Sequence, residues 1–489
     1  MKKQILCLSR AYLSRLFPAM AARHAGADYF HIVQTDAEEA DIRAQGGNVV
    51  LNLERVVREG MARDEATTWR EPTDFRAVTE FDWSPIYSDR SLVNFAPALR
   101  DRIAGILHAA VADLFARHRF DAFVSEPVAI FITHLLFYYC RKHGTRPLLW
   151  ANSYWPDYFY FVDATDLTQP IRTAPVTDAE AEALRQKVET FVDGVAQDKA
   201  GPIYHHAFSG VRNSRLGYFK QRKGELPLVL RPGWSSQVLQ LLRLGRASYK
   251  RLRFPGGADY ITAGSVAEHK AYMRFLMTPR RIYDAPPAEY SADNVVYSLQ
   301  YEPEASLLYF GAPCADQVAF VETLLRALPD GKVLWVKEHP NQFGALGARR
   351  WRELKRRYHN LRFVHGRENG RYLLRCGPLM VTITSSMGMD ALIQGRRVLV
   401  AGDVFYNTFT GATQVRSYEA LARALNEPVN YTPSDNAAAN VGEMAAFGLG
   451  CYPGDPQPSA TLFSEANLDA LVRAVDIEAG RALTREATA

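Results

Sequence analysis

The chain has 489 residues, of which 47% are hydrophobic, 11% aromatic and 23% charged, and its net charge is +5. This composition supplies enough apolar surface for folded cores, which excludes a largely disordered chain. The length predicts two to four domains at about 150 residues per domain. The five cysteines are widely spaced and form no C-x-x-C pair, which excludes a disulfide scaffold and argues against a structural zinc site.

The N-terminus lacks the pattern of a secretory signal, because its apolar stretch at residues 5–8 is ended by Ser9 and Arg10. No run of about 18 uncharged apolar residues follows, so we expect no membrane-spanning helix. We therefore expect a cytoplasmic protein, which could also lie on the inner face of the cytoplasmic membrane.

Positive charge is concentrated in the middle of the chain. Residues 212–281 contain fifteen Lys or Arg and three Asp or Glu, a local balance of +12, so the rest of the chain carries −7. A basic middle between acidic flanks indicates a polyanionic partner such as a phosphate-bearing substrate, a lipid surface or a nucleic acid.

Strands and helices alternate in the first 150 residues. Short apolar runs predict strands at 4–8, 29–34, 48–53, 122–125 and 147–151, and helical spacing predicts helices at 99–118 and 129–143. This alternation predicts a parallel sheet covered by helices on both faces.

The alternation fades over residues 155–290, where we expect a charged helix at 177–197, capped by Thr177, and a basic amphipathic helix at 235–253. It returns after residue 290, with predicted strands at 294–299, 332–337, 361–364, 379–384 and 397–401. The helices expected between them cover 316–328, 351–358 and 388–394.

Polar residues follow four predicted strands of this second half. Ligands of α/β sheets bind beyond the carboxyl ends of the strands, so these residues are candidates for one site. In chain order they are Gln300, Glu304, Lys337, Glu338, His339, Pro340, Thr384, Ser385, Ser386, Gly402, Asp403 and Tyr406.

The segment T-S-S-M-G-M-D-A-L at 384–392 is the most interpretable of these. Its hydroxyl residues can cap a helix whose free N–H groups also favour a bound phosphate. Gly388 would let a ligand approach the backbone, and Asp390 suits the first turns of the helix. The chain contains neither a P-loop nor a G-x-G-x-x-G after its first strand.

Lys337 and His339 are two residues apart and share one face if the strand stays extended. Pro340 biases His339 towards extended geometry, so the pair could form an anion pocket, or His339 could be a structural residue.

Carboxylates also stand at strand ends in both halves of the chain. Glu302 and Glu304 follow the 294–299 strand, and Glu126 follows the 122–125 strand, where it could instead cap a helix. A pair of carboxylates suits glycosyl chemistry, one as nucleophile or cation stabiliser and the other as acid/base. The chain has no D-x-D, which favours a design without a metal.

Four motifs in this order resemble the capsule polysaccharide biosynthesis family, which includes bacterial β-Kdo and related ulosonic-acid transferases. They are Q-x-x-x-[DE] at 300–304, K-x-H-P at 337–340, T-S-x-x-G-x-[ED]-A-L at 384–392 and the F-Y pair at 405–406. The resemblance covers about residues 290–415, and S-E-P at 125–127 extends it weakly to the first half.

The resemblance implies the GT-B fold class, α/β with two Rossmann-like domains facing a cleft and, here, an irregular basic insertion between them. We expect an acceptor-side domain at 1–155, a linker region at 156–290 and a donor domain at 291–489, whose last part is a candidate to pack back on the first domain. It implies a nucleotide-activated donor, typically CMP-Kdo or another CMP-ulosonic acid. Because the chain has no D-x-D, we expect no cofactor and no metal.

In this comparison Glu304 matches the acidic residue that acts as nucleophile in a retaining reaction. His339, Lys337 and the serines would bind the donor's phosphate or carboxylate, Gln300 would position it, and Glu126 is a candidate acid/base. The family pattern has Asp where this chain has Glu304, a displacement of about 1.5 Å for the carboxylate, and Glu302 is a rival for the same role.

We therefore predict a glycosyltransferase of capsule or lipopolysaccharide assembly that acts on a glycan or glycolipid acceptor. The alternatives are an enzyme like UDP-sugar 2-epimerases and a non-catalytic carbohydrate-binding assembly protein. The basic helix at 235–253, with Trp234 at its start, could lie on anionic lipid or could be a solvated helix. No signature of nucleic-acid binding is present.

Overall fold

The computed structural model describes residues 2–63, 67–199, 234–276, 282–340, 342, 344–366, 368–427 and 433–480, without the side chains of 234–237, 272, 274–276 and 433–436. The basic region between residues 200 and 233 therefore lies outside the described residues. The chain divides into two compact units. Unit 1 is formed by Met1–Thr177, Gly245–Ala267 and Leu449–Ala489, and unit 2 by Asp178–Leu244 and Glu268–Gly448.

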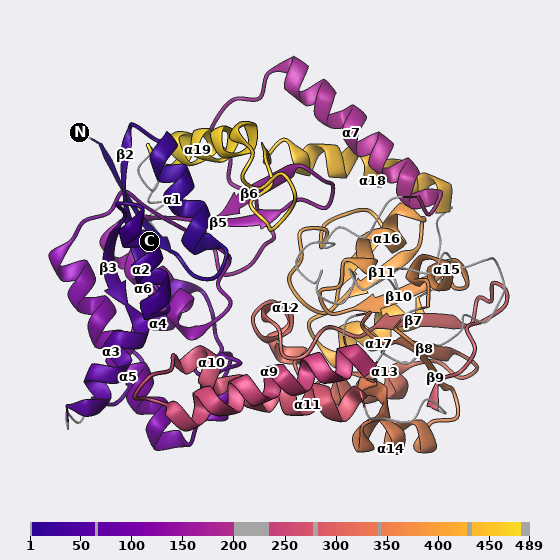
Figure 1. Ribbon diagram of the computed structural model, residues 1–489. Helices are drawn as coiled ribbons and strands as arrows, with labels where there is room; N and C mark the ends of the chain where they lie inside the picture. The colour runs from indigo at the N-terminus through magenta and orange to yellow at the C-terminus, as the bar shows by residue number, and fades with distance from the viewer. Residues whose placement is uncertain are drawn as a thin grey trace. The chain divides into compact units, whose positions relative to one another are not determined.

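Unit 1 is built on a seven-stranded sheet with the order β13-β6-β5-β4-β1-β2-β3 (Figure 1). The first five strands of the chain are parallel, whereas β6 and β13 are antiparallel to their neighbours. The strands are β1 (Lys3–Leu8), β2 (Ala27–Val33), β3 (Asn48–Asn52), β4 (Ala122–Ser125), β5 (Arg146–Asn152), β6 (Tyr158–Val162) and β13 (Tyr452–Pro453).

Helices cover both faces of this sheet, which explains why all four residues of β4 are buried. On one face α1 and α19 pack side by side (Figure 1) and enclose a core that includes Ile5, Trp150 and Leu471. The helices of unit 1 are α1 (Leu13–Arg23), α2 (Asp36–Ala44), α3 (Leu53–Ala62), α4 (Phe75–Thr79), α5 (Pro97–Arg117), α6 (Phe131–His143), α10 (Tyr260–Gly264) and α19 (Glu465–Ala479).

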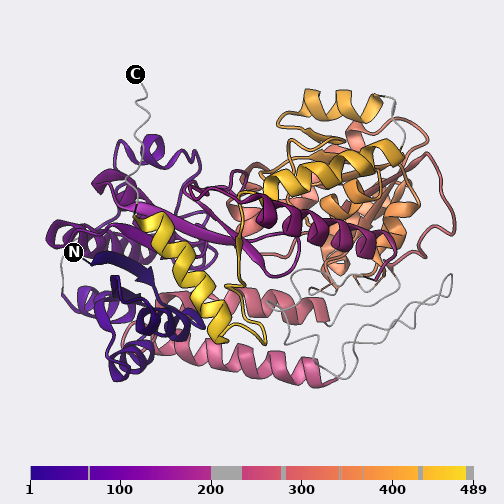
Figure 2. The same ribbon diagram turned by 90° about the horizontal axis from the view of Figure 1, so that it is seen from above.

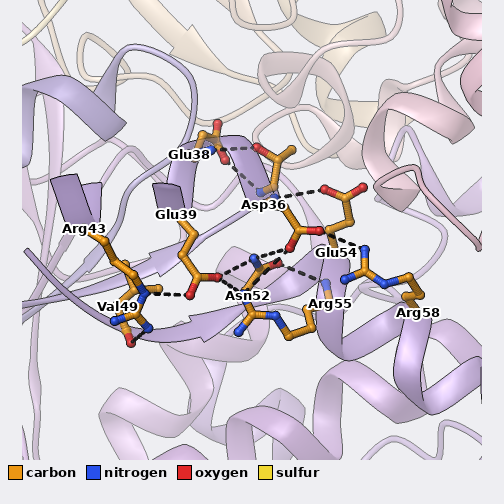
Figure 3. Close-up of polar contacts among 10 residues, drawn as sticks. Asp36, Glu38, Glu39, Arg43, Val49, Asn52, Glu54, Arg55 and Arg58 are labelled. Atoms are coloured by element: carbon orange, nitrogen blue, oxygen red, sulfur yellow. Dashed lines mark hydrogen bonds and ion pairs between the residues drawn. The ribbon is translucent and has the colours of Figure 1, made fainter. Parts of the chain in front are cut away.

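A polar network joins α2 and α3 at the carboxyl ends of β2 and β3 (Figure 3). The buried Glu39 carboxylate accepts hydrogen bonds from Arg43 Nε at 2.8 Å, from Asn52 Nδ2 at 2.7 Å and from Arg55. Asn52 also caps α3 by accepting from the Arg55 amide at 3.0 Å and donates to Asp36 at 2.8 Å. These contacts fix the first turns of both helices against the sheet.

Unit 2 contains a six-stranded parallel sheet with the order β12-β11-β10-β7-β8-β9. Numbered in chain order within the unit and read from β9 to β12, this order is 3-2-1-4-5-6, the strand order of the Rossmann fold. The strands are β7 (Asn294–Ser298), β8 (Val333–Lys337), β9 (Leu361–Val364), β10 (Leu379–Thr382), β11 (Arg397–Val400) and β12 (Ala412–Gln414).

The core of unit 2 lies between this sheet and its helices, and Tyr297, Val336 and Val381 are completely buried in it. Figure 2 shows α18 beside α7, and α18 also packs against α16. The helices of unit 2 are α7 (Asp178–Ala196), α12 (Ala305–Leu308), α13 (Gln317–Ala327), α14 (Arg349–Arg357), α15 (Gly370–Arg375), α16 (Met387–Ile393), α17 (Tyr418–Asn426) and α18 (Pro433–Gly448), together with most of α11 (Val266–Leu276).

The predicted fold class, α/β with two Rossmann-like units as in GT-B glycosyltransferases, is confirmed. The described part of the region 155–290 contains regular elements, namely β6, α7, α10, α11 and the long helix α9 (Trp234–Arg253). Within the described ranges no helix combines the length and apolarity that crossing a membrane would require.

The strand orders also locate the places where a Rossmann-like sheet binds ligands. In each sheet the chain first adds strands on one side of its first strand and then adds the remaining strands on the other side. The connections diverge at this point, which leaves a crevice at the carboxyl ends of the two strands on either side of it. In unit 2 this point lies between β7 and β10, and in unit 1 between β1 and β4.

Candidate functional site

Gln300 lies just beyond the carboxyl end of β7, at the switch point of unit 2. Its main chain is held by Gln317 of α13, whose Oε1 accepts from the Gln300 amide at 2.7 Å and whose Nε2 donates to the Gln300 carbonyl at 3.2 Å. Its side-chain Oε1 accepts from Thr384 Oγ1 at 3.3 Å. Gln300 is 6% exposed, and within the described chain its Nε2 has no hydrogen-bond acceptor. A buried amide donor without a protein acceptor is suited to a ligand oxygen.

The two carboxylates of Q-Y-E-P-E have different environments. Glu302 accepts from Gln317 Nε2 at 2.6 Å, its main chain bonds twice to Gln342, and burial raises the pKa of its carboxyl. Glu304 directly precedes α12, is half-buried, and accepts from Ser306 Oγ at 3.0 Å. Glu302 is therefore tied into the support of the loop, and Glu304 is the better candidate for contact with a ligand.

Thr384 connects the loop after β10 to the loop after β7. Its hydroxyl lies 2.9 Å from the carbonyl oxygen of Ser306 and 3.3 Å from Gln300 Oε1. Since Ser306 also contacts Glu304, these contacts bring Gln300, Glu304 and Thr384 together at one sheet edge.

The serines that follow Thr384 begin α16. Ser385 Oγ accepts from the Met387 amide at 3.2 Å, and the Ser385 carbonyl accepts from the Tyr406 hydroxyl. Ser386 is the N-cap residue, with helical backbone angles. The two serines therefore lie at the start of α16, beside Thr384.

Gly388 is required by packing within the protein. A Cβ atom at this position would lie 2.3 Å from Tyr406 Oη and 2.7 Å from its Cζ. The buried ring of Tyr406 thus occupies the space that the sequence analysis assigned to a ligand approaching the backbone. Asp390 accepts from Arg371 Nε at 3.1 Å, which joins α16 to α15. Gly388, Asp390 and Tyr406 build the frame that carries the two serines.

Lys337 and Glu338 are buried at the end of β8. Lys337 Nζ donates to the Gly366 carbonyl at 2.9 Å and to the Glu338 carbonyl at 3.3 Å, and burial lowers the pKa of Lys337 to about 8. Glu338 accepts from the Tyr283 hydroxyl at 2.9 and 3.0 Å, and burial raises the pKa of its carboxyl to about 7. Lys337 therefore ties together the loops that follow β8 and β9.

His339 and Pro340 are half-buried directly after this pair. The imidazole ring of His339 meets the ring of Tyr301 edge to face, with centroids 5.6 Å apart. Because Tyr301 follows Gln300, His339 lies beside the same loop from the β8 side.

Glu126 belongs to unit 1, where it follows β4 at the switch point beside β1. Its carboxylate accepts from the Tyr12 hydroxyl at 3.0 Å and lies 3.6 Å from an Arg10 guanidinium nitrogen. Burial, and then the Glu126 charge, raise the pKa of Tyr12. Glu126 is thus a half-buried carboxylate oriented by two residues from the loop after β1.

The sequence analysis missed the residues that hold this site, because their polar groups meet their partners only in the folded structure. Gln317 lies in an apolar helix pattern, and Tyr283, Gln342 and Arg371 lie outside every motif. Among the described side chains, no group of three or more His, Cys, Asp or Glu is arranged to hold a metal ion.

The fold and this site define a protein with two Rossmann-like units and a polar constellation at the switch point of the second. Residues 244–433 match the family model described as capsule polysaccharide biosynthesis protein. This match spans the site of unit 2 and confirms the predicted resemblance to that family.

Solved structures similar to this chain include two of Thermosulfurimonas dismutans KpsC. Its β-Kdo 2,4 transferase is 14% identical with a TM-score of 0.29, over 72% of this chain and 87% of that one. Its β-Kdo 2,7 transferase is 11% identical with a TM-score of 0.34, over 75% and 88%. The UDP-GlcNAc 2-epimerase of Methanocaldococcus jannaschii is 11% identical with a TM-score of 0.27, over 92% and 100%.

A search of curated protein sequences gave no match.

Proposed function

We propose that this protein is a glycosyltransferase of bacterial surface-polysaccharide assembly, acting in capsule or lipopolysaccharide biosynthesis. It transfers a Kdo-like ulosonic acid from a CMP-activated donor to a glycan or glycolipid acceptor. The observation that carries the proposal is the junction of Gln300, Glu304 and Thr384 at the switch point of unit 2, inside the segment matched by the family model.

In the proposed reaction the Glu304 carboxylate attacks the anomeric carbon of the donor. The bond from that carbon to the phosphate oxygen breaks, and CMP leaves with the electron pair. An acceptor hydroxyl then attacks the same carbon, loses its proton to a base and releases Glu304. Two displacements retain the anomeric configuration. Glu126 is our candidate for the acid/base, because Arg10 and Tyr12 hold its carboxylate at a strand end.

The donor would be held by polar groups from the loops around β7. The Nε2 of Gln300, which has no acceptor among the described residues, suits a carboxylate or phosphate oxygen, and the Thr384 hydroxyl contacts the same amide group. Ser385 and Ser386 at the start of α16 and His339 beside Tyr301 are the further groups that we propose for the donor. Lys337, Pro340, Gly388, Asp390 and Tyr406 keep these loops in place. We propose that the leaving phosphate is stabilised by these groups without a metal ion, so transfer should persist in EDTA.

Replacing Glu304 by Gln tests the mechanism. Glu304→Gln should lower transfer by a factor of about 1,000 or more, because the amide keeps the shape but is not a nucleophile. Glu302→Gln is the matched control, since its amide oxygen can still accept from Gln317, and it should keep transfer within about threefold. The measurement is transfer of labelled sugar, with nucleotide binding as the check on folding. Wild-type activity in Glu304→Gln would remove this residue from the mechanism.

The donor is tested by thermal shift with CMP, UDP, GDP and their sugars. A ligand that binds only the folded state raises the melting temperature by mass action, and we expect the largest rise with CMP and CMP-ulosonates. A preference for UDP or GDP would refute the ulosonate donor. Turnover of a UDP-sugar to its epimer without acceptor would select the epimerase alternative, and binding without turnover would select the assembly protein.

A further inference from the structure

Helix α9 is strongly basic. Its 20 residues include Arg243, Arg246, Lys250, Arg251 and Arg253 and no Asp or Glu. From Gly245 onward the helix belongs to unit 1. There Ala247 is 2% exposed, the Arg251 guanidinium lies 3.9 Å from the centroid of the Phe95 ring, and Lys250 Nζ lies 3.4 Å from Asp259 Oδ2. These contacts fix one face of the helix on unit 1.

The opposite face of α9 is apolar and exposed. Its side chains include Leu242 at 65% exposed, Tyr249 at 59% and Leu252 at 85%. At 100° per residue these three, together with the exposed Val238 and Leu241, fall within an arc of about 100°. A continuous stripe of this kind is costly in water and indicates a surface that binds another apolar phase.

Exposed arginines border this stripe along one side. Arg246 and Arg253 project about 40° and 20° beyond Leu242 around the helix axis, and Arg243 follows at about 100°. Long cationic side chains beside an apolar stripe can place their charges at lipid headgroups while the stripe enters the acyl boundary.

We propose that α9 docks this protein on an anionic membrane surface, with the axis of the helix parallel to the membrane. The basic side chains are attracted to anionic headgroups, and the apolar stripe adds the burial of its side chains. Charge favours lipid over a second copy of this chain, because pairing two such faces would bring arginines together without acidic partners on the helix. Docking through α9 is independent of the donor and of the reaction.

Flotation of the full chain with vesicles tests the proposal. We expect binding to vesicles of phosphatidylcholine with 30% phosphatidylglycerol, at least tenfold weaker binding to pure phosphatidylcholine, and loss of binding at high salt. Leu242→Ser/Leu252→Ser and Arg243→Gln/Arg246→Gln should each reduce the bound fraction about tenfold or more.

Matched controls place the same changes elsewhere on the surface. Val93→Ser/Leu449→Ser removes two exposed apolar side chains, and Arg352→Gln/Arg356→Gln removes two exposed arginines of α14. Both should bind vesicles like the wild type. Absence of binding, equal binding to neutral vesicles, or equal loss in the controls would overturn the proposal. A stable dimer seen in sedimentation, and dissociated by Leu242→Ser/Leu252→Ser, would also overturn the proposal.

Discussion

The end of β8 shows how single residues serve the core and the site together. Lys337 and Glu338 are neighbours in the chain, and each is at most 4% exposed. Lys337 donates to the Gly366 carbonyl, and Glu338 accepts from the Tyr283 hydroxyl and the Leu346 amide. These contacts fix the main chain from which the half-buried His339 follows. Burial makes the charged form of each residue less favourable, which moves the two pKa values towards neutrality.

This burial predicts a pH dependence of stability. The pKa of Glu338 rises from 4.5 to about 7 on folding, so the folded protein holds the proton more tightly than the unfolded chain. The contribution of Glu338 to the free energy of unfolding is therefore greatest below about pH 4.5 and decreases until about pH 7, by at most about 3 kcal/mol. In urea unfolding, the free energy of unfolding of Glu338→Gln should not show this decrease between about pH 4.5 and 7.

Glu289→Gln is the control for that experiment, because Glu289 is exposed. It should reproduce the wild-type profile between pH 4.5 and 7. Identical profiles for wild type and Glu338→Gln would show that Glu338 does not keep its proton in the folded state.

At the scale of elements, the beginnings of helices are held by side chains from neighbouring helices as well as by their own caps. Thr35 and Glu38 form a capping box at the start of α2, and Asn52 caps α3 while donating to Glu39 and Asp36 of α2 (Figure 3). The buried amide of Asn52 therefore both caps α3 and connects it to α2.

Asn52→Ala should lower the free energy of unfolding by about 2 kcal/mol. It removes the cap of α3 and takes a donor from the buried Glu39 carboxylate. Arg58→Gln, which breaks an exposed ion pair with Asp36 in the same network, should cost less than about 1 kcal/mol. Urea denaturation of both variants is the measurement, and equal losses would contradict the assigned role of Asn52.

On the scale of the whole molecule, unit 1 is completed by a segment that is distant in sequence. β13 pairs with β6, and α19 packs against α1 and β5. The completely buried Glu478 of α19 lies 2.9 Å from an Arg146 guanidinium nitrogen and accepts from the Thr173 amide at 2.7 Å. Residues after 448 therefore supply part of the core of unit 1.

Truncation after residue 448 should loosen unit 1 selectively. We expect faster hydrogen exchange in peptides from β5 and β6, with unchanged protection in β7 and β10 of unit 2. Leu471→Ala is a milder variant that leaves a cavity at a completely buried position and should cost about 2–4 kcal/mol. Equal protection of β5 and β6 in the full and truncated chains would contradict this dependence.

The sequence alone determined most of the parallel strands and the edge at which the candidate site lies. Buried parallel strands are continuous apolar runs, so the predicted 122–125 and 361–364 coincide with β4 and β9. β6 was not predicted, because it lies where the alternation of strands and helices fades. The strand-end rule drew attention to Gln300 and Thr384, which the structure joins, whereas the catalytic roles of Glu304, Glu126 and His339 remain predictions.

Only the tertiary structure decided which of these side chains support the loops. Gln317 holds Glu302, Tyr406 fills the space over Gly388, and Lys337 donates to the loop after β9. Apolar periodicity reports which face of an element is buried, and it is a local property of the chain. The partners of Glu302 and Lys337 lie 15 and 29 positions away in the chain, so these contacts are defined only when the strands have taken their order in the sheet.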